Sequence, residues 1–218
     1  MDQSFETIVA TNDAARGTEE QMSTCGGNEN GRMAIYRFRV LLLPNPPLEF
    51  EPETEVYREI EIDGSSTLAD LHEAIFDAFD RYDSHAYEFL TRDERGIATR
   101  SYVHPQLYSG EKSWQPMDDE EIDRFLDHAI PDDEPEEAKD RFRELRKHPP
   151  EEGNAAETTI DDLELDQSQT LFYEFDFGDG WEHHIDIEAI REGSLDYDSV
   201  VVEKQGAAPP QYPDRQGN

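Results

Sequence analysis

The chain has 218 residues, of which 53 are acidic and 19 basic, so its formal net charge is −34. Such a chain lacks the basic surface that broad binding to nucleic acid or anionic lipid requires. The single cysteine, Cys25, excludes an intramolecular disulfide and a zinc site built from cysteines. No run of about 18 apolar residues is present, and the acidic N-terminus does not resemble a secretory signal. We therefore expect a cytoplasmic protein with no membrane segment and no direct nucleic-acid binding.

The acidic residues are spread along the whole chain, and only four residues are lysine. At molar salt the electrostatic screening length falls to about 3 Å, which largely cancels repulsion between surface carboxylates. The composition therefore predicts a halophilic protein whose acidic surface is covered by water and solvent cations. The alternative is a DNA mimic, whose carboxylates would bind a basic protein partner. Molar salt would stabilise a halophilic protein but would release the partner of a mimic.

The first 32 residues are polar and without periodicity, which predicts a disordered N-terminal extension. The folded domain is expected over residues 33–205. A first strand is predicted at 34–43, with Tyr36, Phe38 and Val40 on one face. A second strand is predicted at 55–62, and the glycine and serines at 64–66 indicate a turn after it.

A helix is predicted to follow Thr67, which is a good N-cap, with Asp70 placed to complete a capping box. Apolar residues at helical spacing predict a core-facing stripe, namely Leu68, Leu71, Ile75, Phe76 and Phe79. Further strands are predicted at 84–90 and 97–103. The acid-rich stretch 111–156 predicts an insertion of two exposed helices. A last strand is expected at 199–203, before a Pro-rich tail at 206–218.

The strongest local pattern alternates with a period of two on both sides of Gly178-Asp179-Gly180, which predicts a β-hairpin. One predicted face is apolar and aromatic, comprising Leu171, Tyr173, Phe175, Phe177, Trp181, His183, Ile185 and Ile187. The other face is mostly acidic. A capped turn of helix is expected just before the hairpin, at 158–163.

The segment Phe175-Asp-Phe-Gly-Asp-Gly-Trp-Glu-His-His-Ile185 resembles the motif of the plasmid pRiA4b ORF-3-like family. Residues 34–43, 67–75, 83–89 and 160–163 resemble the other motifs of this family, in the same order. The resemblance implies an α+β fold in a single domain, with a mixed or antiparallel sheet, a C-terminal β-hairpin and few helices. It implies no established activity, although some members are encoded on mobile elements. The tail lacks the cysteine-containing segment with which many members end.

The polar and loop residues within these motifs form the candidate functional set, namely His72, Asp83, His85, Asp176, Gly178, Asp179, Gly180, Trp181, Glu182 and His183. Most have a structural interpretation: Trp181 and His183 as core, Asp179 as a turn former, and Gly178 and Gly180 as residues with positive φ. No catalytic residue, metal or cofactor is predicted. We expect a non-catalytic accessory or interaction module with a protein partner.

An alternative is a metal-assisted hydrolase or nuclease that uses His72, His85, Asp176 and His183. Imidazoles and carboxylates are suitable ligands for a divalent transition metal. The spacing offers little support, because no two histidines lie four residues apart on one helix.

Overall fold

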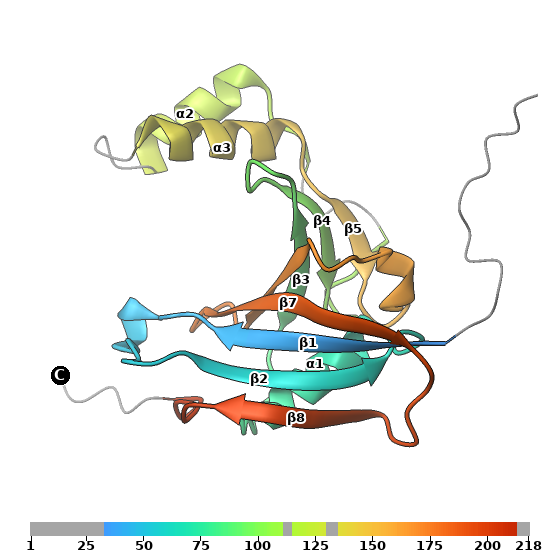
Figure 1. Cartoon of the computed structure of the whole chain (residues 1–218). Coiled ribbons are helices and arrows are strands. Elements are labelled where there is room, and N and C mark those ends of the chain that lie inside the picture. Colours follow the sequence, from blue (N-terminus) through green and yellow to red (C-terminus); the bar gives the residue numbers. More distant parts are fainter. Residues whose placement is uncertain (1–32, 111–114, 130–134, 213–218) are drawn as a thin grey trace, which may run out of the picture. The chain divides into compact units, whose positions relative to one another are not determined.

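The computed structural model describes residues 33–110, 115–129 and 135–212, and the predicted extension at 1–32 lies outside them. Eight strands form one sheet in the order β5-β4-β3-β6-β7-β1-β2-β8 (Figure 1). Only the pair β4–β5 is parallel. The fold is therefore α+β with a mixed sheet, as expected, and all described residues belong to one compact unit. No helix in these ranges is long and apolar enough to cross a membrane.

The strand β1, Ala34–Leu42, is third from one edge of the sheet and pairs with β2, Val56–Asp63, and with β7, Trp181–Glu192. Tyr36, Phe38 and Val40 are buried, as their alternation predicted. β8, Ser199–Gln205, pairs with β2 and forms one edge of the sheet.

The helix α1, Leu68–Ala78, begins with the predicted capping box between Thr67 and Asp70. The hydroxyl of Thr67 accepts a hydrogen bond from the Asp70 amide, and the Asp70 carboxylate accepts one from the Thr67 amide. Such a box satisfies two amides that the first turn of a helix leaves without partners. Leu71 and Ile75 bury the apolar stripe of α1 in the core cluster, together with side chains from one face of the sheet.

The second half of the sheet contains β3, Tyr87–Arg92, β4, Ala98–Val103, and β5, Glu151–Asn154. The first two lie close to their predicted positions. β5 was not predicted, because its sequence Glu-Glu-Gly-Asn has no apolar alternation. It forms through its parallel pairing with β4, which no local pattern reveals.

The parallel strands β4 and β5 are joined in sequence by an acidic segment that contains α2, Asp119–Ala129, and α3, Glu136–Lys147. The two helices pack against each other, with the rings of Phe125 and Phe142 stacked at a centroid distance of 5.0 Å. Most of their side chains are exposed or half-buried, as predicted, but Ile122 and Leu126 of α2 are buried. Arg95, in the turn between β3 and β4, forms an ion pair of 3.7 Å with Glu144 of α3.

The predicted hairpin consists of β6, Thr170–Phe175, and β7. Its loop spans residues 176–180 and is longer than the predicted three-residue turn. Asp176 adopts a left-handed backbone with φ of 58°, which ends the alternation of β6. Phe177 is consequently 46% exposed, so its prediction as a core residue is wrong, whereas Phe175 and Trp181 are buried.

Part of the segment interpreted as a Pro-rich tail packs on the domain. Gln211 is 1% exposed, and its side chain accepts hydrogen bonds from the amides of Tyr82 and Asp83 and donates one to the Asp83 carbonyl. Arg81 donates to the Pro209 carbonyl. The residues up to Tyr212 therefore complete the structure around the loop between α1 and β3.

Candidate functional site

The family-motif residue His72 lies in the core, where α1 meets the sheet. Its Nδ1 is 2.7 Å from the Tyr173 hydroxyl, and its ring stacks on Tyr87 at a centroid distance of 3.7 Å. Burial, with a smaller contribution from the charge of His104, lowers the pKa of His72 to about 3. The imidazole is therefore neutral near pH 7 and acts as a buried ring.

His183 and Trp181 occupy a neighbouring part of the core, as their alternation predicted. The His183 ring packs between Phe79 and Tyr173, at centroid distances of 5.0 and 5.2 Å. Burial, and then the charge of Arg81, lower the pKa of His183 to about 3. The guanidinium of Arg81 lies 4.5 Å from the centre of the Trp181 ring, which is a cation–π geometry. These side chains serve packing, because no surface is left for a substrate to reach them.

His85, Asp83, Asp176 and Tyr212 form a cluster of polar side chains. The Nε2 atom of His85 lies 3.7 Å from an Asp176 oxygen, 3.6 Å from an Asp83 oxygen and 2.7 Å from the Tyr212 hydroxyl. Tyr212 donates a hydrogen bond of 2.6 Å to Asp83, which raises the pKa of Tyr212 to about 12.

Of the four residues in the metal-site alternative, the structure brings together only His85 and Asp176. His72 and His183 instead pack among core rings, as described above. Within the described ranges, no three His, Cys, Asp or Glu side chains are arranged to hold a metal ion.

The glycine-rich motif forms a loop that two side chains hold in place. The Asp176 carboxylate accepts hydrogen bonds from the amides of Gly178 and Asp179, at 3.1 and 3.4 Å. Buried Asn45 donates to the carbonyls of Asp179 and Gly180. Gly180 has the expected positive φ, of 64°, but Gly178 does not. The carboxylate that caps the turn is therefore that of Asp176, where the sequence had pointed to Asp179.

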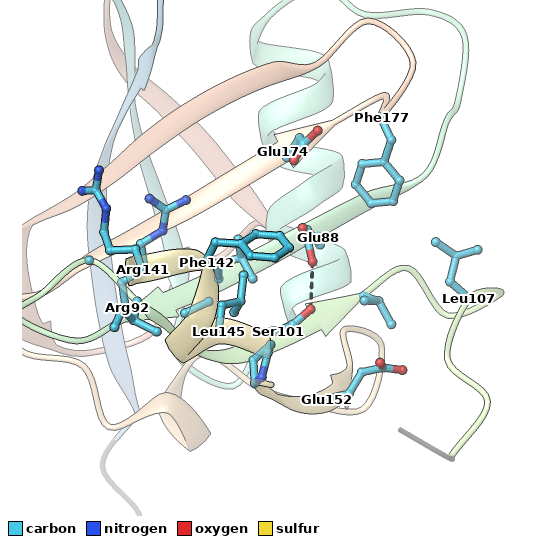
Figure 2. A pocket seen from close by; sticks show the side chains of 16 residues that line it. Glu88, Arg92, Ser101, Leu107, Arg141, Phe142, Leu145, Glu152, Glu174 and Phe177 are labelled. Carbon is cyan, nitrogen blue, oxygen red and sulfur yellow. Dashed lines mark hydrogen bonds between the residues drawn. The ribbon is translucent and has the colours of Figure 1, made fainter. Parts of the chain in front are cut away.

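A groove of about 810 Å³ lies between the sheet and α3 (Figure 2). Its walls are largely apolar, with contributions from Leu90, Val103, Leu107, Phe142, Leu145 and Phe177. It lies on the sheet face opposite to α1, because Leu90 alternates with the buried residues Tyr87 and Phe89 along β3. The exposed ring of Phe177, turned outward by the loop at Asp176, reaches this groove.

Three carboxylates line the same groove: Glu152 of β5 and, on the central strands, Glu88 and Glu174. Glu88 of β3 and Glu174 of β6 are direct partners in the strand register. Burial raises the pKa of both, and for Glu174 the charges of Glu88 and Glu182 raise it further. Ser101 donates a hydrogen bond of 2.8 Å to Glu88 (Figure 2). Glu182, in the candidate set, is exposed on β7 directly opposite Glu174.

No local pattern in the sequence indicates this groove. Glu174 lies on the predicted acidic face of the hairpin, where solvent exposure is the ordinary expectation, and the predicted strand at 84–90 assigns no face to Glu88. Their proximity depends on the pairing of β3 with β6, and Phe142 joins them only through the packing of α3. The one local signal is Asp176, since aspartate adopts positive φ more readily than most residues and could therefore end the alternation before Phe177.

Comparisons with known proteins agree with this architecture. A family model described as "Plasmid pRiA4b ORF-3-like protein" matches residues 47–212. The crystal structure of a protein of unknown function from Methanosarcina mazei Go1 is similar, with a TM-score of 0.51 and 16% identity. The similarity covers 83% of this chain and 74% of that one, and it extends to the fold alone. No curated protein matches the chain.

Proposed function

We propose that this chain, which belongs to the plasmid pRiA4b ORF-3-like family, is a non-catalytic interaction domain that binds a protein partner in the groove beside α3. One contrast supports the proposal: the imidazoles of His72 and His183 are packed as core rings, while the groove is lined largely by apolar side chains. Concave, largely apolar sites with a few polar groups are typical of ligand recognition.

Burial argues against acid–base catalysis by the motif residues. His72 and His183 are 3% and 2% exposed, so a substrate has no contact with either ring. General acids and bases have to lie within hydrogen-bonding reach of the proton that they transfer. Trp181 is packed in the core, and the Asp176 carboxylate holds the loop by accepting hydrogen bonds from its amides.

The metal-assisted hydrolase remains the alternative to be tested, because His85 and Asp176 are neighbours. The protein in molar KCl would be incubated with bis(p-nitrophenyl) phosphate and with DNA, in the presence of Mg²⁺, Mn²⁺ or Zn²⁺. We expect hydrolysis rates equal to those of the same metal ion in buffer without the protein. Metal-dependent turnover that disappears in His85→Ala and Asp176→Asn would overturn the proposal.

Site-specific photo-crosslinking tests the groove directly. A benzophenone amino acid placed at Phe177, within the groove, should give a discrete adduct in which mass spectrometry locates one segment of one partner. The control carries the same amino acid at Val202, an exposed position on β8. Equal adducts at both positions, or none at Phe177, would contradict a groove-specific partner.

We further propose that the protein works in a high-salt cytoplasm, in a setting related to mobile elements. The net charge of −34 and the low lysine content support the first part, and the plasmid origin in the family's name supports the second. A DNA mimic is the competing explanation of the acidity.

Dilution from molar KCl to low salt should therefore unfold the domain, because surface carboxylates repel one another once screening weakens. Circular dichroism during the dilution measures this effect. An unchanged spectrum would remove the salt-adaptation proposal, and it would favour the mimic if a basic partner bound only at low salt.

A further inference from the structure

The groove contains part of a row of carboxylates that runs across three adjacent strands. Glu88 of β3 is opposite Glu174 of β6, which is in turn opposite Glu182 of β7. Like charges directly opposite on neighbouring strands destabilise a sheet. Burial increases this cost for the first two, as their raised pKa values indicate. The row is therefore unfavourable for the isolated fold.

Nothing in the described part of the chain neutralises the two inner carboxylates by direct contact. Glu88 accepts a hydrogen bond from neutral Ser101, and neither Glu88 nor Glu174 has an ion-pair partner there. The charge of Arg92 lowers the pKa of both and so offsets part of the effect of burial, but its guanidinium lies 4.0 Å from the centre of the Phe172 ring and bonds neither carboxylate. Because a groove with apolar walls has a low local dielectric, an incoming cation would be attracted more strongly than at an open surface.

The remaining lining limits the ligand that would fit. Figure 2 shows Arg92 and Arg141 at one end of the groove, away from Glu88 and Glu174, and both arginines line it. This arrangement favours one cation at the acidic end and disfavours a polycation along the whole length. Phe142 and Leu145 of α3 offer apolar contact beside that position.

We infer, building on the proposed function, that the groove recognises a peptide segment of the partner through one arginine, whose guanidinium binds between Glu88 and Glu174. The apolar neighbours of that arginine pack on Phe142 and Leu145. A volume of about 810 Å³ exceeds what a single side chain fills, so the site accommodates flanking residues as well. Arginine suits the position better than lysine, because its planar fork can bond two carboxylates and stack on an aromatic ring.

Pentapeptide libraries would test the inference in molar KCl, where the domain is expected to be folded. One library carries a central arginine between randomised neighbours, and the other carries neutral citrulline, which has nearly the same shape. Charge-assisted hydrogen bonds contribute enough that the best arginine peptides should bind about tenfold more tightly, or better, than their citrulline counterparts. The double variant Glu88→Gln, Glu174→Gln should abolish this preference.

Two controls distinguish recognition from general effects of charge or folding. Glu188→Gln removes an exposed strand carboxylate of β7 outside the groove and should leave the preference unchanged. The double glutamine variant should retain or increase its melting temperature, so that a loss of binding cannot be attributed to unfolding.

Each outcome decides a different point. Equal affinity for arginine and citrulline peptides would overturn the cation site while leaving the groove as a binding surface. An absence of binding to both libraries would overturn the site and the proposed function together. Binding of N-acetylarginine amide as tight as that of the best peptides would show that a small free cation, and not a peptide, is the ligand.

Discussion

The two faces of β3 and β6 differ sharply although they are built from the same short strands. On one face Tyr87, Phe89, Tyr173 and Phe175 pack with α1 into a dry layer of rings. On the other face Glu88, Leu90 and Glu174 line an open groove. Residues one position apart in the sequence thus experience opposite environments, because successive side chains of a strand point to opposite sides.

The contrast separates the requirements of stability from those of binding. The ring face is filled by residues whose removal would leave a cavity. The groove face retains neighbouring carboxylates that the fold alone would not favour. Substitutions on the first face should therefore change stability, and those on the second should change recognition.

The largest expected effect comes from Trp181→Ala on the ring face. Trp181 is fully buried and lies under the guanidinium of Arg81. Loss of a buried aromatic side chain should lower the free energy of unfolding by about 3–5 kcal/mol. Urea denaturation in molar KCl measures this value, and Trp181→Phe provides a milder variant if the alanine variant does not fold.

The matched control for this experiment is Phe177→Ala on the groove side. Phe177 is 46% exposed, so the free energy of unfolding of the Phe177→Ala variant should remain within about 0.5 kcal/mol of that of the parent protein. Similar losses for Trp181→Ala and Phe177→Ala would contradict the proposed division between the two faces.

Acid should weaken the ring face through its two buried histidines. The pKa of His72 and of His183 is lowered to about 3, whereas an unfolded histidine titrates near 6.5. As the pH falls below about 6.5, the unfolded chain binds protons that the folded chain does not bind. Stability should then decrease by up to about 1.4 kcal/mol per pH unit for each histidine, until the folded pKa is reached.

Urea denaturation at several pH values between 7 and 4 would measure this slope, with His183→Phe as the comparison. The phenylalanine variant should show a shallower loss of stability, since one of the two groups is gone. Identical slopes in the parent and the variant would argue against a neutral, buried His183.

The smallest expected effect belongs to the groove face. The raised pKa of Glu174 means that its ionised form disfavours folding, so its contribution to stability falls as the pH rises through the folded pKa. Glu174→Gln should therefore stabilise the domain near pH 7, toward the low end of the roughly 0.2–1 kcal/mol typical of cross-strand pairs. Thermal unfolding measures the gain, and Glu188→Gln should give almost none.

Much of the fold follows from local patterns in the sequence. The capping box at Thr67, the alternation of β1 and the two strands of the hairpin are all visible without knowledge of pairing. Their physical basis is short-range, in helix-end hydrogen bonds and in the period of two along a strand.

The groove could not be predicted in the same way. It requires that β3 pair with β6 and that α3 pack across them, and neither relation leaves a local signal. The exposure of Phe177 also escaped prediction, because continued alternation across Asp176 would have placed its ring in the core. The candidate residues from the motif thus indicated the loop that presents Phe177 but not the surface that it joins.

The position of β1 in the sheet has a consequence for how the domain acquires its structure. Among the strands of the described residues, β1 comes first in the sequence, yet it lies between β2 and β7, and β7 begins 147 positions after β1 (181 − 34 = 147). Contacts between residues so distant in the chain slow folding, since a long loop has to close first. Until β7 and β8 are synthesised, the β1–β2 pair has no strand partner on either edge, and unpaired strand edges of this kind favour aggregation and chaperone binding.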